Sequence, residues 1–367
     1  MAHKLNFLGI KGFKSIAEFA FYPRQINVFI GPNGAGKSNF ITFFTFLSYL
    51  VNEQLSKRIP QLGGSSDILH DGPDKTPLLS AELSIETEKG FNDYRFQLMF
   101  TKPDGLAFAQ EEYRFSNKKS SSPERWRSCG VGHLEAQLPS IDNQTAKVIK
   151  GLLQKLIVYQ FHNTSDTASI RLSWSTDDGR WLKSNAQNLG SFLFRLKRED
   201  PPYYRRIKDY IRLILPFFDD FELYDSFGKT LLRWKEINSE KVFNAGQASD
   251  GMLRAIALTA LLAQNPKDLP AVLFLDEPEL GLHPSAIKLI GQLIHTASID
   301  TQVFLATQSV TLLNQFNIDD VVVIERNNRA SKFKTFTASD QEDLQAYLEE
   351  YTLGEMWERN IIGGKPL

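Results

Sequence analysis

Cysteine, long apolar runs and an excess of either charge are all missing from this sequence. The single cysteine, Cys129, excludes a disulfide framework and a cysteine-based zinc site. The longest apolar stretch, residues 40–51, is interrupted by hydroxyl side chains and is too short to span a bilayer. Lysine and arginine total 42 against 43 acidic residues, so a nucleic-acid surface would have to be a local patch.

The rest of the composition is that of a globular protein. Hydrophobic residues make up 42% of the chain and charged residues 23%, which excludes wholesale disorder. At about 150 residues per domain, 367 residues suggest one large or two medium domains. The N-terminal segment lacks the apolar core of a secretory leader, and there is no internal repeat. We therefore expect a cytoplasmic protein without a membrane partner.

Hydrophobic patterning predicts a parallel sheet built from both ends of the chain. Short apolar strands are expected at 26–30, 271–275, 302–306 and 320–324, and helices alternate with the later ones. A further strand is expected at 4–10, and a helix at 38–55. This alternation is typical of an α/β fold.

The middle of the chain has a different pattern. Residues 78–86, 94–101 and 107–115 alternate apolar and polar side chains, which predicts an antiparallel sheet with one buried face. A helix is expected over 141–156, and residues 188–215 are expected to be mostly helical with a break at Pro201-Pro202. A short strand is expected between them at 157–161. We therefore expect an inserted lobe of antiparallel strands and helices.

The clearest motif follows the strand at 26–30 and matches G-x-x-x-x-G-K-S. Its residues are Gly31, Pro32, Asn33, Gly34, Ala35, Gly36, Lys37 and Ser38. Glycines let backbone N–H groups close around a β-phosphate at a helix N-terminus. Lys37 would lie between the β- and γ-phosphates, and the Ser38 hydroxyl would ligate Mg²⁺. A guanine-specific Asn-Lys-x-Asp string is missing, which favours ATP as the nucleotide.

A second motif follows the apolar strand at 271–275. Asp276 occupies the position of a carboxylate that holds the magnesium shell, and Glu277 is placed to polarise an attacking water. Together with the phosphate loop, this pair predicts hydrolysis of ATP to ADP and phosphate.

A third motif, Ser249, Asp250 and Gly251, precedes an amphipathic helix. Ser249 or Asp250 would cap that helix, and Gly251 would let a phosphate approach its N–H groups. An ordinary capped helix gives the same pattern. The position just before the acidic pair favours the anion site.

The order of these motifs resembles that of ABC-type ATPases of the SMC and RecF class. Residues 13–16 (Phe-Lys-Ser-Ile) are similar to the opening strand motif of that class, residues 279–284 to its D-loop, and residues 306–309 to its switch segment. The tail at 353–357 is similar to compact, stand-alone bacterial ATPases of predicted phage-defence and DNA-maintenance operons. The resemblance covers both ends of the chain well and the middle only in layout.

The resemblance assigns roles to further residues. It implies that Lys14 contacts the nucleotide, that Gln160 touches Mg²⁺, and that Gln308 senses the γ-phosphate. It also implies that residues 249–251, the signature residues, serve the ATP of the opposite subunit. Asp250 departs from the glycine of the transporter-like Ser-Gly-Gly-Gln, and glutamine replaces the usual histidine at 308, where it cannot titrate. A glutamine without a special role remains an alternative at both positions.

A basic set lies between residues 195 and 212. Its members are Arg195, Lys197, Arg198, Arg205, Arg206, Lys208 and Arg212. Tyrosines are interleaved with them, as in surfaces that contact phosphate backbones or acidic partners. A solvated helix face explains the same composition, so both interpretations stay open.

The expected fold is an α/β ABC-type P-loop ATPase head, with a mixed or parallel core sheet. The core would comprise residues 1–59 and 244–336, the inserted lobe 60–243, and a helical tail 337–367. The expected function is ATP-driven homodimerisation, or a higher homo-oligomer, that switches an effector such as a nuclease encoded nearby or a nucleic-acid complex. A DNA-repair head acting directly on DNA is the alternative. A transporter ATPase subunit is disfavoured by residues 13–15 and by the signature.

Overall fold

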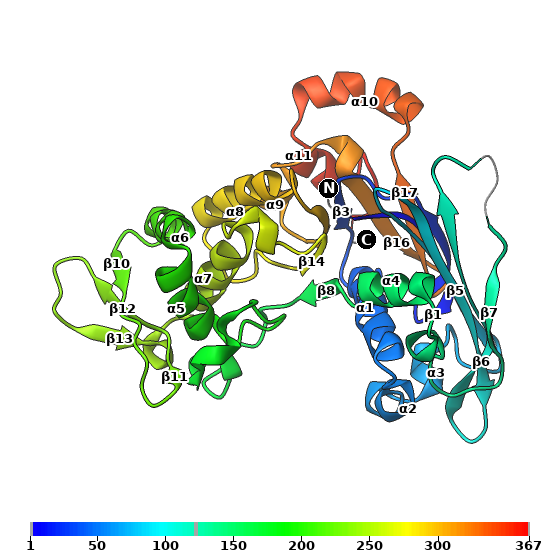
Figure 1. Ribbon diagram of the computed structural model, residues 1–367. Coiled ribbons are helices and arrows are strands. Elements are labelled where there is room, and N and C mark those ends of the chain that lie inside the picture. The colour runs from blue at the N-terminus through cyan, green and yellow to red at the C-terminus, as the bar shows by residue number, and fades with distance from the viewer. Residues whose placement is uncertain (1–2, 121–123, 366–367) are drawn as a thin grey trace.

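Two six-stranded sheets organise the protein, which is described by a computed structural model over residues 3–120 and 124–365. The core sheet lies at the centre of Figure 1, the antiparallel sheet on the right and a helical lobe on the left. The expected core and tail extend into residues 1–2 and 366–367, which lie outside the described residues.

The core sheet has the strand order β17-β16-β3-β15-β14-β8. Its strands are β3 (Ile26–Ile30), β8 (Leu156–Tyr159), β14 (Val272–Asp276), β15 (Gln302–Ala306), β16 (Val321–Asn327) and β17 (Ala330–Thr335). All neighbours pair in parallel except the edge strand β17, which is antiparallel to β16. Strands β3, β14 and β15 are buried at every position because both faces of the sheet are covered.

Alternate side chains of β3 enter two separate hydrophobic cores. Val28 and Ile30 pack with the helical lobe, whereas Phe29 packs with the antiparallel sheet. The longer helices are α1 (Lys37–Val51), α4 (Gln144–Leu153), α5 (Leu189–Glu199), α6 (Pro201–Ile214), α7 (Asp250–Leu262), α8 (Pro284–Ala297) and α10 (Ala338–Glu350). The shorter ones are α2 (Leu55–Arg58), α3 (Ser65–Ile68), α9 (Val310–Leu313) and α11 (Leu353–Glu358).

The antiparallel sheet has the order β2-β1-β4-β5-β6-β7. Its strands are β1 (Lys4–Phe13), β2 (Ile16–Phe21), β4 (Leu78–Glu86), β5 (Gly90–Thr101), β6 (Gly105–Asn117) and β7 (Arg127–Gly130). Buried and partly exposed residues alternate along β4, as the sequence pattern predicts for a sheet with one buried face. Helices α1 and α4 contribute to the same core.

The expected boundaries at residues 60 and 243 do not coincide with the two sheets. Strands β1 and β2 precede residue 60 yet pair with the antiparallel sheet, and β8 lies within 60–243 yet forms the edge of the core sheet. The sequence pattern of a strand reports which side chains are buried, but not which strand it pairs with. Strand β8 therefore divides the inserted region into a sheet part and a helical lobe.

The helical lobe follows β8. The expected break at Pro201-Pro202 is confirmed, since α5 ends at Glu199 and α6 begins at Pro201, where proline is well tolerated in the first turn of a helix. The lobe's short strands are β9 (Trp174–Ser175), β10 (Phe218–Phe221), β11 (Lys229–Thr230), β12 (Arg233–Glu236) and β13 (Val242–Asn244).

The tail carries α10, which has no buried residue, and α11, which packs on α9. Over residues 3–120 and 124–365, none of the helices combines the length and the apolar character needed to cross a bilayer.

Candidate functional site

Four sequence motifs meet at one edge of the core sheet. Strands β3, β15, β14 and β8 are parallel neighbours, so their carboxyl ends lie at the same edge, where ligands bind in open α/β sheets. Strand β3 leads into the phosphate loop (residues 31–38), β15 into Gln308, β14 into Glu277 and β8 into Gln160. The fold therefore gathers residues that are up to 277 positions apart in the chain.

Lys37 is buried at the start of α1 and turns back on its own loop. Its Nζ donates to the carbonyl oxygens of Gly31 and Pro32 at 2.7 and 3.0 Å. Burial lowers the pKa of Lys37, and the carboxylates of Glu277, Asp276 and Glu279 oppose that shift. The lysine therefore lies in the electrostatic field of the acidic groups at the same sheet edge.

The phosphate loop rests on a buried serine pair. Ser331 on β17 donates from Oγ to the Ala35 carbonyl at 2.5 Å and lies 2.7 Å from Ser15 Oγ, which also accepts from Asn39. A Cβ at Gly36, whose φ is +116°, would overlap Ser331 Oγ. Ser15 belongs to the motif at 13–16, whereas no sequence signal distinguishes Ser331.

Asp276 has one carboxylate oxygen bonded and one free of protein partners. Its Oδ2 accepts from the Gln160 amide at 2.9 Å, whereas Oδ1 is buried without a hydrogen-bond partner among the described residues. Burial raises the pKa of Asp276. A hard cation such as Mg²⁺ takes oxygen ligands, so the unpartnered oxygen fits a magnesium shell shared with Ser38. His162 Nε2 donates to the Asp276 carbonyl at 2.8 Å.

Glu277 and Gln308 are in direct contact. The Gln308 amide donates to the Glu277 carboxylate. Glu277 has a φ of +41°, and its N–H donates to the Ala306 carbonyl at 2.8 Å. A non-glycine residue held in this left-handed region stores strain, which is typical of functional sites. The two residues can thus act on the same reacting group.

Glu279 is a buried carboxylate that positions the switch segment. Its Oε1 accepts from Thr307 Oγ1 at 2.5 Å and from the Gln308 N–H at 3.1 Å. Burial raises its pKa. The sequence indicated this residue only as part of the segment 279–284.

The signature residues lie at the start of α7. Ser249 is exposed and caps the helix by accepting from the Met252 N–H at 3.2 Å. A Cβ at Gly251 would lie 2.5 Å from the Gly281 carbonyl, so the small size of Gly251 serves contact within the chain as well as any expected phosphate approach. In Figure 1, α7 and α1 lie on opposite sides of β8. Among the described residues, no hydrogen bond joins residues 249–251 to the phosphate loop.

Lys14 lines a polar cavity beside the phosphate loop. The cavity has a volume of about 530 Å³, and it shares Ser15 and Asn39 with the support of that loop. Arg326, another lining residue, donates to the Gly34 carbonyl at 3.1 Å. The cavity therefore borders the residues that support the phosphate loop.

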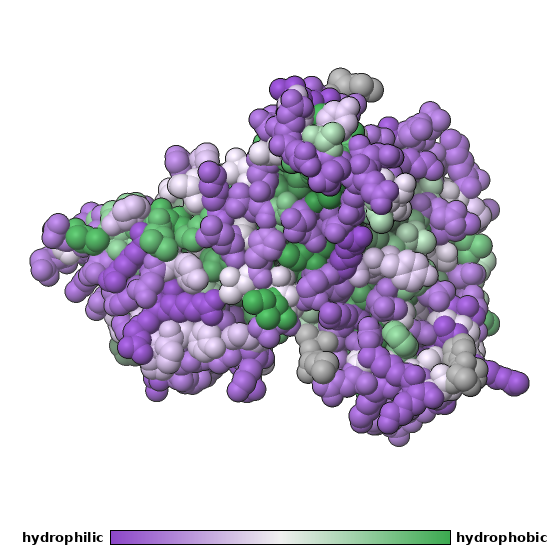
Figure 2. All heavy atoms as spheres, turned by 90° about the horizontal axis from the view of Figure 1, so that it is seen from above, coloured by the Kyte–Doolittle hydropathy of each residue, from purple (hydrophilic) through white to green (hydrophobic). Residues whose placement is uncertain are grey.

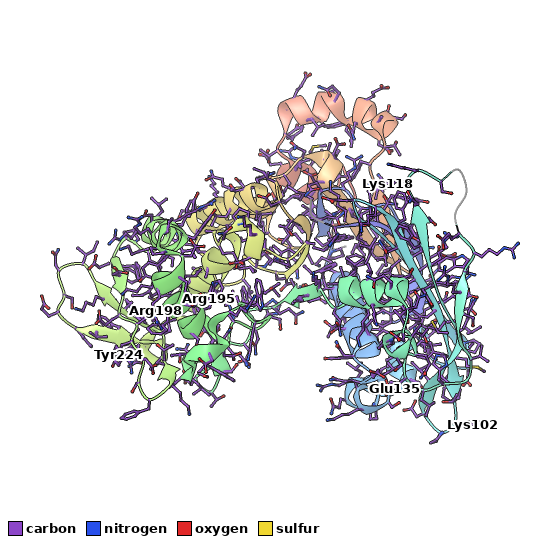
Figure 3. All side chains as sticks on the ribbon, in the orientation of Figure 1. Lys102, Lys118, Glu135, Arg195, Arg198 and Tyr224 are labelled. Carbon is purple, nitrogen blue, oxygen red and sulfur yellow. The ribbon has the colours of Figure 1, made fainter. Side chains whose placement is uncertain are left out.

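The basic set is less positive than its composition indicates. Arg195 pairs with Glu199 and Asp268, Lys208 with Asp220, and Arg212 with Asp209 and Asp219. Among the described residues, Lys197, Arg198, Arg205 and Arg206 have no ion pair. Figure 3 shows Arg195 and Arg198 on α5, in the helical lobe and away from the phosphate loop.

Comparisons with known proteins identify the fold. A family model described as "AAA domain, putative AbiEii toxin, Type IV TA system" matches residues 26–314. An SMC head bound to the C-winged helix domain of ScpA is 17% identical, with a TM-score of 0.63 and coverage of 91% of this chain and 98% of that chain. The SMC head of Pyrococcus furiosus, bound to the C-terminal domain of ScpA, is 14% identical, with a TM-score of 0.64 and coverage of 95% and 99%. No curated protein matches. The expected ABC-type ATPase head fold is confirmed.

Proposed function

The chain belongs to this family of AAA-domain proteins, with an SMC-like ATPase head, and we propose that it binds ATP with Mg²⁺ and hydrolyses it. The observation that carries the proposal is the convergence of the phosphate loop, Asp276, Glu277 and Gln308 at one sheet edge. Phosphoryl transfer to water needs groups that hold the phosphates, the metal ion and the attacking water, and these residues would supply them.

The phosphates would be held by the loop amides and by Lys37. Ser38, Asp276 and Gln160 would hold the magnesium ion, which supplies charge neutralisation for the phosphates when bound. The support for this assignment is the unpartnered Asp276 Oδ1 beside a bonded Gln160 amide. The nucleoside would extend into the cavity lined by Lys14.

Glu277 would accept a proton from the attacking water, and Gln308 would orient it. The Gln308 amide donates directly to the Glu277 carboxylate, and a water that replaces this bond would meet one donor and one acceptor. Glu279 fixes the switch backbone and thereby the direction of the Gln308 side chain.

A second copy of the chain would complete the site. Ser249, Asp250 and Gly251 present a capped helix end, which attracts anions, but among the described residues they form no hydrogen bond or ion pair with the phosphate loop of their own chain. A C₂ dimer would place them on the partner's ATP and close two nucleotides between the subunits.

ATP-driven closure would then act on a partner. The similar SMC heads are bound to ScpA domains, and the family description refers to a toxin of a type IV system. We therefore extend the proposal to the switching of an effector protein, or of a nucleic-acid complex, in phage defence or DNA maintenance in the cytoplasm.

Two variants test the site and the composite arrangement separately. Lys37→Ala should lose ATP binding by calorimetry, because the ammonium that meets the phosphates is gone, whereas its melting temperature stays near that of the wild type. Ser249→Arg should bind ATP as the wild type does but should not hydrolyse it, because the arginine blocks the partner's nucleotide. Wild-type affinity in Lys37→Ala would contradict the phosphate site, and wild-type turnover in Ser249→Arg would contradict the shared site.

A further inference from the structure

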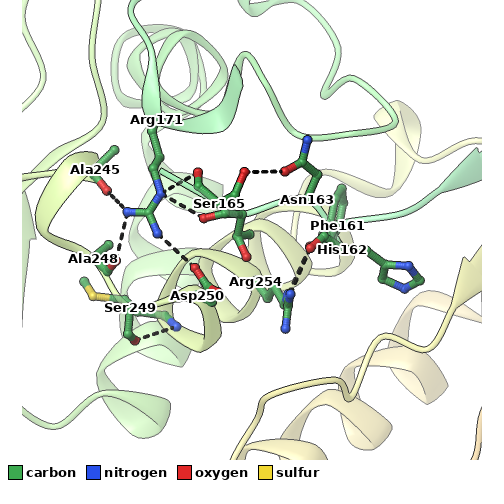
Figure 4. A network of polar contacts seen from close by, with 12 residues as sticks. Phe161, His162, Asn163, Ser165, Arg171, Ala245, Ala248, Ser249, Asp250 and Arg254 are labelled. Carbon is green, nitrogen blue, oxygen red and sulfur yellow. Dashed lines mark hydrogen bonds and ion pairs between the residues drawn. The ribbon is translucent and has the colours of Figure 1, made fainter. Parts of the chain in front are cut away.

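Arg171 is a buried arginine, and each of its three guanidinium nitrogens donates at least one hydrogen bond. Its side chain is 6% exposed and lies at the end of a 3₁₀ turn, Ser169–Arg171. Nε donates to the carbonyls of Thr164 and Ser165, and Nη1 donates to those of Ala245 and Ala248 at 2.6 and 2.9 Å. Nη2 donates to Asp250 Oδ1 at 2.9 Å, as Figure 4 shows.

These bonds join two segments that are 80 residues apart in the chain. One segment, residues 161–165, directly follows Gln160, which donates to Asp276. The other, residues 245–250, leads into α7. Because the guanidinium is rigid and planar, five bonds to it fix the distance and the direction between the two segments.

Arg254, one turn into α7, adds a second link. It donates to the carbonyls of Phe161 and His162 at 3.1 and 2.9 Å and to the Leu280 carbonyl at 3.0 Å. Its guanidinium therefore connects the residues after Gln160, the signature helix and the segment 279–284. Figure 4 shows both arginines on either side of the start of α7.

The pairing with Arg171 gives Asp250 a role that a glycine at this position could not have. A buried guanidinium is costly unless its charge and its donors are satisfied. Four carbonyl groups accept from Nε and Nη1, and Asp250 is the one carboxylate paired with the guanidinium among the described residues. Asp250 is thus held beside Ser249 from within its own subunit, and its side chain is half-exposed.

We propose that Arg171 is a positioning residue. It fixes the position of the signature residues, and that position depends on whether Mg²⁺ and ATP are bound at the nucleotide site of the same subunit. Binding of Mg²⁺ and ATP at Gln160 and Asp276 would move residues 161–165, and the Arg171–Asp250 bond carries that movement to Ser249. The inference rests on the proposed function, since Ser249 matters only when a partner's ATP reaches it.

Steady-state kinetics separates this role from a merely structural one. Arg171→Lys keeps the charge but cannot reach acceptors on both segments, so kcat should fall at least about tenfold while KM for ATP stays within about twofold. Asp250→Asn keeps an acceptor oxygen for Arg171 and should lower kcat less than Asp250→Lys, which places a like charge beside Arg171 and should match Arg171→Lys. The control is Arg212→Lys, which alters an ion pair with Asp219 in the same lobe and should change neither parameter.

Hybrid dimers show which of the two nucleotides is affected. Glu277→Gln on the Arg171→Lys chain keeps ATP bound there but stops its hydrolysis, so the remaining activity comes from the wild-type site served by the altered signature, and this hybrid should be nearly inactive. Glu277→Gln on the other chain leaves the site of the Arg171→Lys chain, served by a wild-type signature, and this hybrid should keep the activity of a hybrid that carries Glu277→Gln alone. Equal activity of the two hybrids, or an unchanged kcat in Arg171→Lys, would overturn the inference.

The controls keep this result apart from the proposed function. If Glu277→Gln, which slows hydrolysis, and the wild type both stay monomeric with ATP, the ATP-bound dimer itself is wrong. If they dimerise and Arg171→Lys is unfolded by circular dichroism, Asp250→Lys decides, because its side chain is 55% exposed and its substitution leaves the core intact. Full activity of Asp250→Lys would then overturn the inference.

Discussion

Lys37 and Asp276 show how burial prepares a site for a charged ligand. Burial shifts their two pKa values in opposite directions, downward for the lysine and upward for the aspartate, because each loses the water that stabilises its charge. The phosphates and Mg²⁺ would replace that water. Without ligands, the two buried charges therefore lower the stability of the fold, and bound phosphates and Mg²⁺ would offset this loss.

This imbalance predicts a pH-dependent effect of Asp276→Asn. The folded-state pKa of Asp276 is raised, so its charge lowers the stability of the fold at pH 7, and this loss disappears as the pH falls through the raised pKa. Without ligands, the asparagine variant should melt at a higher temperature than the wild type at pH 7, and the difference should narrow on acidification. Calorimetric scans from pH 7 to pH 4 measure it; a lower melting temperature for the variant at pH 7 contradicts the argument.

Sequence motifs identify the residues that would contact the nucleotide, but not the residues that hold those side chains in position. Residues such as Lys37, Asp276 and Gln308 have fixed spacing from strand ends, which a single sequence reveals. Arg171 and Arg254 bind mainly backbone carbonyls of distant segments, and such partners leave no pattern in the sequence. Their positions become visible only when the chain is folded.

At the scale of elements, the strands were predicted well and their partners were not. The ranges 26–30, 78–86 and 302–306 agree with β3, β4 and β15. The short strands β9 and β11 have two residues each, too few to show a period. The pairing of β8 with β14 could not be predicted from the sequence, since a strand of four residues does not specify its neighbour.

The edge strand β17 supports the phosphate loop, and this predicts the effect of Gly36→Ala. The added methyl group would meet Ser331 Oγ at a backbone conformation that alanine disfavours. We expect a loss of about 1–3 kcal/mol in the free energy of unfolding and a loss of ATP binding. The control, Gly151→Ala in α4, has open space around it and should gain about 0.5–1 kcal/mol. Urea denaturation and calorimetry measure both; unchanged stability in Gly36→Ala would contradict the contact.

At the scale of the molecule, two lobes flank the core sheet, and Figure 2 shows a mainly hydrophilic face with hydrophobic groups in separate small areas. A nucleic acid that bound the unpaired members of the basic set would cover several elements of the helical lobe. The charge of the basic set is limited, since three of the seven members are in ion pairs.

Replacing Arg198, Arg205 and Arg206 with alanine tests this surface. If it binds a nucleic acid, affinity for duplex DNA or RNA should fall, and the slope of log K against log salt should become shallower by about one per lost phosphate contact. ATP turnover without nucleic acid should not change. Lys288→Ala, on α8, is the control. An unchanged salt slope would assign the segment to a solvated helix face.

The central claim is that two chains close around ATP, and the mass of Glu277→Gln measures it most directly. Glutamine keeps the shape of Glu277 but cannot accept the proton from water, so ATP and Mg²⁺ should remain bound and hold the dimer closed. Light scattering should give twice the monomer mass of 41.7 kDa with ATP and the monomer mass without it. The same mass in both conditions, together with wild-type hydrolysis, would contradict both the role of Glu277 and the closed dimer.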